Sequence, residues 1–373
     1  MKAKPKRKPR TSRVRGATAL FSRATSPAPA LVPATQLSAW AERCLRAVKV
    51  SRGDARLIAA SLVQTSLWGI DSHGIARLGH YLARFTAGSI EVRPRLRFKR
   101  SGPCSAQLDG AHGHGMVVCH RAMGEAIKLA RKNGLGAVGV SNSTHCGAIG
   151  LYGRQAAAAG MISIGFTHSD AFVAPHGGRE KFLGTNPICI AVPTNDPARP
   201  LCFDMATSAV PYNRVMNYRR ENRPLGRGWA LDAKGRETTD PHAVACLLPL
   251  AGHKGYGLAM MIDLLCGPLN GMPFGPHIPP MYVHLGRRRR LGSFFLVINP
   301  RRFAGGVGLA KVATRFAREA RAQPRAAGVK EILVPGEPEE RCAKRRAREG
   351  IPIEAGLHEE FADWSRRLGV TPP

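Results

Sequence analysis

The chain has 373 residues, of which 44% are hydrophobic and 22% charged, so it is long enough for two domains and typical of a globular protein. No run approaches the roughly 20 apolar residues of a membrane span, and no apolar signal segment follows the basic start. The net charge of +31, from 56 Lys and Arg against 25 Asp and Glu, keeps nucleic-acid binding open as a second class of function.

The first predicted segment is a basic arm over residues 1–34. Nine Lys and Arg residues precede the first acid, Glu42, and charge repulsion with few core residues favours disorder. Such an arm could bind nucleic acid, act as a transit peptide, or have no role. Two further Arg clusters, at 287–290 and 341–348, lie in the body of the chain. We expect them to form solvated faces or to help bind anionic ligands.

Two helices are predicted next, over residues 35–50 and from Ser51 to about residue 67, with Ser51 and Asp54 resembling a capping box. They are followed by a segment that carries chemistry. We expect Ser72 and His73 at the entry of a third helix, and Arg77 and Tyr81 four residues apart on one of its faces. That face could hold the carboxylate of a small acid, because Arg offers a bidentate fork. A capped helix with a surface Arg and a half-buried Tyr is the structural alternative.

The middle of the chain alternates helices with short apolar strands separated by glycines, which predicts an α/β or α+β domain. After residue 307 the pattern is helical again, so the two chain ends could pack together as one discontinuous domain. The predicted helices cover residues 116–133, 155–159, 257–269 and 358–368, and the predicted strands cover residues 136–141, 161–166, 188–192, 201–203 and 294–298.

Residues 134–139 match the pattern G-x-G-x-x-G, but they follow a predicted helix and precede a predicted strand. A dinucleotide fingerprint needs the opposite order, so that phosphate meets a helix N-terminus. These glycines therefore predict a helix end and a thin strand. His112, His114 and His120 lack nearby ligands to complete a metal site, and no metal is expected. Nine cysteines without a Cys-x-x-Cys pair favour reduced thiols and a cytoplasmic location.

His145 follows a predicted strand on a loop of small residues. An imidazole at a strand end can face a cleft and exchange a proton near neutral pH, although a half-buried structural histidine fits the same pattern. Loops at 169–178, 184–187 and 204–208 carry hydroxyl, amide and acidic groups that could bind a ribose or phosphate, or could be ordinary turns. Lys254 at a predicted helix start adds a credible anion site.

Taken together, these segments resemble the malate/L-lactate dehydrogenase family that lacks the Rossmann fold. The resemblance spans about residues 36–370, and several further segments most resemble the ureidoglycolate dehydrogenases of that family. The segments that carry the family resemblance, in order, are residues 71–74, 144–147, 175–178, 184–187, 204–208, 254–258 and 335–337.

The resemblance implies a fold of the α/β class, with a non-Rossmann dinucleotide-binding domain on a mixed sheet (residues 101–306) and a helical domain built from residues 35–100 and 307–373. It also implies a homodimer and NAD as cofactor, with NADP as the alternative. His145 would be the acid/base, and Ser72, His73, Arg77 and Tyr81 would line the substrate and nicotinamide pocket. The residues implied to hold the dinucleotide are Ser169, Asp204, Met205, Ala206, Lys254, Gly336, Glu337 and Pro338. One departure from the family pattern is Trp68, where Arg is common.

The function expected is hydride transfer between nicotinamide and a small 2-hydroxy acid, with ureidoglycolate as one candidate. Malate, lactate, sulfolactate, diketogulonate or a cyclic imine would be alternative substrates on the same scaffold. The alternative from another class, a nucleic-acid-binding protein, has only the charge in its favour, since no zinc-finger, RNA-recognition or helix-turn-helix signature is found.

Overall fold

The computed structural model describes residues 29–373. Most of the basic arm predicted over residues 1–34 therefore lies outside the described residues. The end of that range is folded, contrary to the prediction: strand β1 (Ala30–Val32) pairs antiparallel with β11 (Ile351–Ile353). The pairing is stabilised by burial, because Val32, Ile351 and Ile353 all enter the core.

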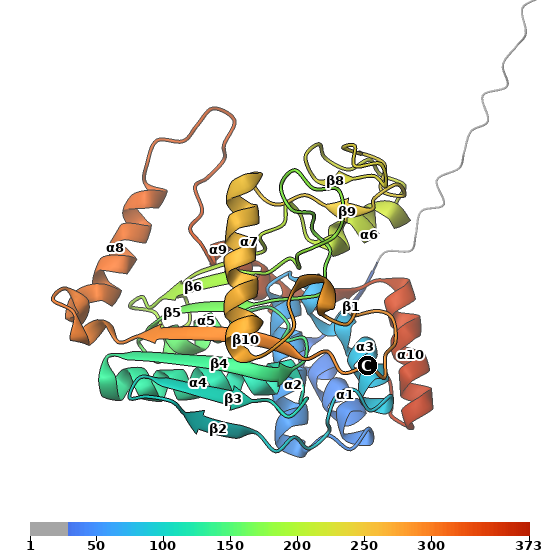
Figure 1. Cartoon of the computed structure of the whole chain (residues 1–373), viewed down its shortest axis with the longest axis horizontal. Helices are drawn as coiled ribbons and strands as arrows, with labels where there is room; N and C mark the ends of the chain where they lie inside the picture. The colour runs from blue at the N-terminus through green and yellow to red at the C-terminus, as the bar shows by residue number, and fades with distance from the viewer. Residues whose placement is uncertain (1–28) are drawn as a thin grey trace, which may run out of the picture.

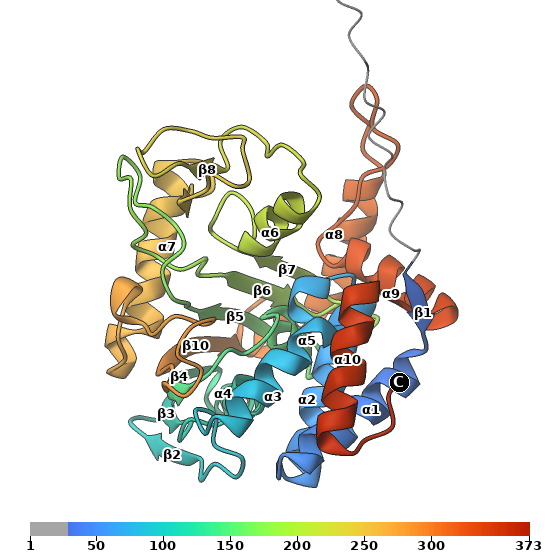
Figure 2. The same cartoon turned by 90° about the vertical axis from the view of Figure 1, so that its right-hand side faces the viewer.

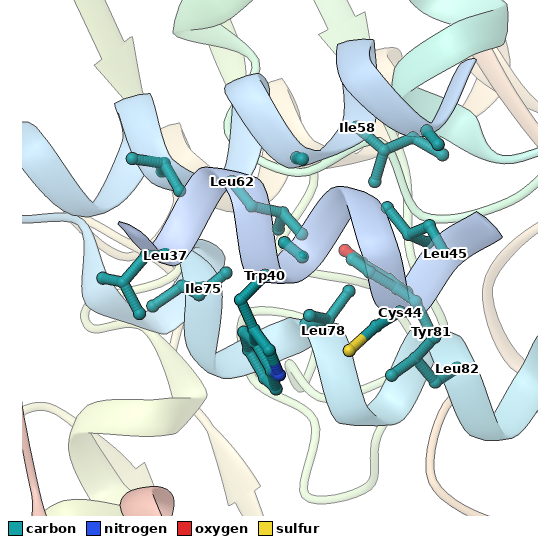
Figure 3. Close-up of a cluster of buried hydrophobic side chains, with 14 of the residues drawn as sticks. Leu37, Trp40, Cys44, Leu45, Ile58, Leu62, Ile75, Leu78, Tyr81 and Leu82 are labelled. Atoms are coloured by element: carbon teal, nitrogen blue, oxygen red, sulfur yellow. The ribbon is translucent and has the colours of Figure 1, made fainter. Parts of the chain in front are cut away.

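Helices from both ends of the chain share one core. Figure 3 labels members of this core that lie between Leu37 and Leu82. The helices are α1 (Ala34–Ala47), α2 (Arg52–Leu67), α3 (Leu78–Thr86) and α10 (Ala355–Leu368). The predicted cap of α2 is confirmed, since the Ser51 side chain accepts a hydrogen bond from the Asp54 N–H. Phe361 of α10 packs on Trp40 of α1, with ring centroids 4.3 Å apart. The last helix is therefore needed to complete a core that the first helices begin.

The centre of the molecule is a seven-stranded mixed sheet with the order β2-β3-β4-β10-β5-β6-β7 (Figure 1). Only β3 and β4 pair in parallel, and every other neighbouring pair is antiparallel. A Rossmann sheet is mostly parallel, so this sheet is a different fold, as predicted. The strands are β2 (Arg97–Arg100), β3 (Ser105–Asp109), β4 (Leu135–Ser143), β5 (Ile162–Thr167), β6 (Ile188–Val192), β7 (Leu201–Met205) and β10 (Leu291–Ile298).

Three helices cover this sheet. Helices α4 (Gly115–Asn133) and α5 (Gly150–Ala158) form a second core with the strands on one face, and α7 (His253–Cys266) crosses the opposite face (Figures 1 and 2). Gly134 ends α4 with φ +91° and β4 begins at Leu135, so the rejection of the G-x-G-x-x-G pattern is confirmed.

A small unit above the sheet was not predicted from the sequence. It contains α6 (Tyr212–Arg220) and the two-residue strands β8 (Ala230–Leu231) and β9 (Cys246–Leu247), and it has its own core against α7. Such short strands show no alternation of apolar and polar residues that a sequence pattern could detect. The short 3-10 helices of the chain are Asp71–His73, Ile75–Arg77, Pro268–Asn270, Gly275–His277, Pro300–Arg302 and Gly306–Gly308.

After residue 307 a helical stretch was predicted. The structure has two separate helices there, both before β11. Helix α8 (Leu309–Arg321) stands at the margin of the molecule, far from α10 (Figure 1), and a loop leads from it to α9 (Glu337–Glu349). Val312 and Phe316 of α8 are exposed. This helix contributes no residue to the core that α10 shares with α1.

Two properties of the described residues complete the fold. All nine cysteines of the chain fall within residues 29–373 and all are free thiols. Across the same range, no helix combines the length and the apolar character needed to cross a membrane.

Candidate active site

The segment from Asp71 to Arg77 folds as two 3-10 turns, and this corrects one prediction. Ser72 does not cap the third helix, since α3 begins only at Leu78. The reason is Gly74, whose extended backbone separates the turns and where a Cβ would lie 2.1 Å from Ser66 Oγ. Ser72 instead contacts its neighbour, with Oγ 2.8 Å from Nδ1 of His73.

Four of the predicted residues meet at one place. Tyr81, only 1% exposed, holds its hydroxyl 2.7 Å from Nδ1 of His145. The His73 ring stacks on the His145 ring, with centroids 5.3 Å apart and 25° between planes. Arg77 donates from Nε to the Ser72 carbonyl and from Nη1 to the hydroxyl of Tyr282 (2.7 Å). His145 lies two residues beyond the end of β4, so the strand-end placement is confirmed.

The electrostatics of this cluster keep its imidazoles neutral. Burial lowers the pKa of His145 well below 6.5, and the nearby charges of Arg77 and Arg289 lower it further. Burial, with Arg77, also lowers the pKa of His73 to about 4. Burial raises the pKa of the Tyr81 hydroxyl. The cluster therefore presents neutral hydrogen-bonding groups beside fixed positive charge, a setting that attracts an anion.

Arg289 and Asp170 belong to this site, and the sequence did not reveal them. The 287–290 cluster was expected to be solvated, yet Arg289 is 2% exposed and donates to Asp170 Oδ1 at 2.5 Å. Its Nε is buried and makes no hydrogen bond within residues 29–373. Asp170 Oδ2 accepts the N–H of Met281 at 3.0 Å. In a run of four arginines, the sequence does not indicate which one is buried, so only the fold could identify Arg289.

The loop that carries Arg289 is fixed by a second buried arginine. Arg84 of α3 donates to the carbonyls of Pro280, Met281, Leu285 and Arg287. This places Tyr282 against Arg77, whose guanidinium lies 5.7 Å from the centre of the tyrosine ring. The 280–287 segment is therefore held in a fixed position along one side of the site.

The residues implied to hold a dinucleotide form a second group near the end of β7. Asp204 Oδ2 accepts the N–H of Gly150, the first residue of α5, at 2.8 Å. Surrounding protein raises the pKa of Asp204 to about 6, although the residue remains exposed to solvent. The turn at Gly336 lies beside β7, because Cys202 N–H donates to the Pro335 carbonyl (3.2 Å). Met205 and Ala206 continue from Asp204 and are partly buried.

The other four residues implied to hold the dinucleotide differ in how free their side chains are. Glu337 forms ion pairs with Arg321 and Arg341, and Pro338 follows it in the first turn of α9. Ser169 accepts the N–H of Thr185 at 3.3 Å and adjoins Asp170. The side chain of Lys254 is exposed in the first turn of α7 and makes no hydrogen bond or ion pair within residues 29–373. Within the same range, no three His, Cys, Asp or Glu residues are grouped to hold a metal ion.

Comparison with known proteins shows to which family the chain belongs. Residues 32–362 match the family model described as malate/L-lactate dehydrogenase. The chain belongs to the malate/L-lactate dehydrogenase family. It is 40% identical over 304 residues to a ureidoglycolate dehydrogenase (NAD(+)) of Escherichia coli O157:H7, covering 82% of this chain and 87% of the relative.

Two solved structures of this family have the same fold. A malate dehydrogenase from Pyrococcus horikoshii OT3 is similar with a TM-score of 0.84 and 34% identity, covering 92% of this chain and 97% of that one. A sulfolactate dehydrogenase from Methanocaldococcus jannaschii has a TM-score of 0.86 and 32% identity, covering 92% and 98%. The chain is therefore an oxidoreductase of the hydroxy-acid class.

Proposed function

We propose that this protein is an NAD-dependent dehydrogenase of small 2-hydroxy acids. The observation that carries the proposal is the pair of buried Tyr81 and partly buried His145 beside the guanidinium of Arg77. To oxidise a 2-hydroxy acid, a protein must supply a base for the hydroxyl proton and, beside it, a group that binds the carboxylate. Bound nicotinamide would supply the hydride acceptor.

His145 acts as the base in this proposal. When its proton resides on Nδ1, the ring donates to the Tyr81 oxygen and leaves the lone pair of Nε2 for the substrate hydroxyl. Tyr81 holds the ring through Nδ1, which also accepts the N–H of Gly147 at 3.3 Å, and the stacked His73 limits its rotation. The tautomer with its proton on Nδ1 is therefore a requirement of the proposal, because a phenol can either donate or accept. In the reverse direction the protonated ring returns the proton to the oxygen of the 2-oxo acid.

Arg77 holds the substrate carboxylate. Its Nη2 makes no hydrogen bond within the described part of the chain, and a carboxylate that replaces Tyr282 at Nη1 would meet both terminal nitrogens. The buried Arg289, whose Nε lacks a partner among residues 29–373, supplies a second positive group for a polar end of the substrate. For this reason we propose a substrate that carries a second polar group besides its carboxylate (a two-ended acid), such as ureidoglycolate or malate.

A panel assay tests the function and its substrate. Ureidoglycolate, malate, lactate, sulfolactate and their 2-oxo partners would be supplied with NAD or NADP, and absorbance of the reduced cofactor would be followed. We expect two-ended acids with NAD to give the highest kcat/KM. Absence of turnover on every acid with either cofactor would refute the proposal.

The pKa of His145 sets an expected pH dependence. Because the folded protein lowers this pKa well below 6.5, the free enzyme keeps its base unprotonated to more acidic pH than an ordinary imidazole would. kcat/KM for oxidation should therefore stay level from about pH 8 to about pH 6 and decline only below that range. The measurement is a pH profile of oxidation at limiting acid, and a decline centred at 6.5 would contradict the assignment.

The second group of residues fits a dinucleotide. Gly336 has φ +91°, and a Cβ there would lie 3.1 Å from the Pro200 carbonyl and 3.3 Å from Arg154 Nη2, so only bare backbone fits this turn. Asp204 Oδ1 makes no hydrogen bond among residues 29–373 and could accept ribose hydroxyls. Lys254 with the first turn of α7 suits a phosphate.

Lys254→Ala is expected to weaken NADH binding by about 1–3 kcal/mol, the cost of one lost charged hydrogen bond. Its side chain is exposed and makes no hydrogen bond or ion pair within residues 29–373, so the fold should not change. Fluorescence titration of NADH measures the effect, with Lys234→Ala on another exposed turn as the matched control. Equal affinities in the two variants would remove Lys254 from the phosphate site.

We propose further that two copies of the chain associate through the apolar side chains that α7 and α8 leave exposed. Met261 and Leu264 of α7 and Val312 and Phe316 of α8 are all about half exposed or more, and their burial between two copies would be favourable. Light scattering should show a dimer. Phe316→Glu should give monomers, whereas Arg318→Glu on the same helix should not.

A further inference from the structure

Trp68, at the C-terminal end of α2, contacts a residue next to the proposed dinucleotide site. It is 8% exposed, and the guanidinium of Arg154 lies 4.5 Å from the centre of its ring. Arg154 donates from Nη1 to Glu340 Oε1 (2.6 Å) and from Nη2 to the Gly336 carbonyl (3.4 Å). One side chain therefore joins the end of α2 to the turn that opens α9.

The other end of α9 holds the substrate segment. Arg346 forms a two-pronged pair with Asp71, the residue before Ser72, at 2.5 and 2.9 Å. It also donates to the Ser66 carbonyl near the end of α2. Gly69 has φ +79°, and a Cβ there would lie 2.9 Å from Cys342 Sγ of α9. Helix α9 and the 66–71 segment are thus fastened at both ends of their contact.

Arg154 also takes part in the dinucleotide group. It lies on α5, the helix whose first N–H is accepted by Asp204 Oδ2 at 2.8 Å, and it donates to the Gly336 carbonyl. The Gly336 turn and Trp68 therefore share one guanidinium, carried by the helix whose first N–H Asp204 accepts. A planar cation can stack and donate in two directions at once, which an ammonium cannot do.

We propose that Arg154 and Trp68 are positioning residues that couple binding of the dinucleotide to binding of the acid. A dinucleotide that orders the Gly336 turn also fixes Arg154, and through Trp68 and α9 it fixes the segment that carries Ser72 and His73. The inference rests on the proposed function, since it uses the dinucleotide turn and the substrate segment as assigned there. Linkage requires the effect to be reciprocal: each ligand tightens the other by the same factor.

The test measures binding and does not depend on turnover. The Kd of NAD would be titrated by calorimetry with and without saturating oxalate, and the Kd of oxalate with and without NAD. Oxalate serves as an unreactive dicarboxylate probe of the acid site. In the wild type we expect each ligand to tighten the other by about fivefold or more.

Trp68→Leu should bring that factor close to one while both ligands still bind. Trp68→Phe, which keeps an aromatic face for Arg154, should retain most of it. Arg154→Lys should lose as much as Trp68→Leu, and Arg199→Ala, at an exposed pair with Asp196, is the control that should lose nothing. Wild-type coupling in Trp68→Leu and Arg154→Lys would overturn the inference.

Two outcomes in the wild type separate this inference from the proposed function. If NAD and oxalate each bind but do not affect one another, the coupling is refuted and the proposed function stands. If NAD does not bind at all, both are refuted. Should Trp68→Leu fail to fold, Arg154→Lys alone decides the matter.

Discussion

His145→Ala is expected to lower kcat for 2-hydroxy acids by about two to four orders of magnitude, the usual contribution of a general acid–base group. The imidazole is partly buried, its pKa is lowered, and Tyr81 holds one of its nitrogens. The Tyr81 hydroxyl is not a substitute base, because burial raises its pKa and keeps it protonated at neutral pH. NADH affinity, measured by fluorescence, should change little.

Two variants frame this result. Tyr81→Phe removes the hydroxyl 2.7 Å from Nδ1 and keeps the ring, so it should lower kcat by less than His145→Ala does. His242→Ala changes an exposed imidazole that contacts Asn222 in a surface loop, and it should have no effect. Wild-type turnover by His145→Ala would remove this residue from the chemistry.

Arg77→Lys is expected to reduce kcat/KM on 2-hydroxy acids by about two orders of magnitude, although the charge is preserved. Lys cannot offer two parallel hydrogen bonds to a carboxylate, and it cannot also hold the Ser72 carbonyl as Nε does now. Because orientation of the C–H bond would be lost, kcat should decrease together with the rise in KM. Steady-state kinetics on the preferred acid give both values.

The control is a substrate without a carboxylate. Any weak turnover of a neutral alcohol should be the same in the wild type and in Arg77→Lys. Arg288→Lys, in the same basic segment as the buried Arg289 but itself exposed, should behave as wild type on acids. If Arg77→Lys matched wild type on every accepted acid, the carboxylate site would have to be sought at Arg289.

The parts of this protein that the sequence predicted are those with local signals. Ser51 capped its helix as expected, and the order of helix, glycine and strand around Gly134 excluded a Rossmann fingerprint. His145 stood at a strand end because the β-branched and small residues before it favour a strand. Periodicity and capping depend on neighbours a few residues away, which a sequence displays directly.

The parts it missed depend on distant segments. Nothing near Arg289 indicates that Asp170, 119 residues earlier, receives its charge in a buried pair. Arg346 belongs to a cluster expected to be solvated, yet it holds Asp71 at the other end of the chain. Gly74 changed the expected helix entry into two 3-10 turns through a close contact with Ser66. Each of these outcomes is decided by tertiary packing, which overrides local preference.

The place of β10 in the sheet has a consequence for how the chain acquires its shape during synthesis. Residues 291–298 lie between β4 and β5, which come more than a hundred residues earlier. Until β10 leaves the ribosome, β4 and β5 each expose an unpaired edge, and such edges favour aggregation. The helical core can be completed only later still, because it includes Ile351 and Phe361. We therefore expect chains interrupted before about residue 300 to need chaperones and to be degraded, since contacts so distant in sequence form late and slowly.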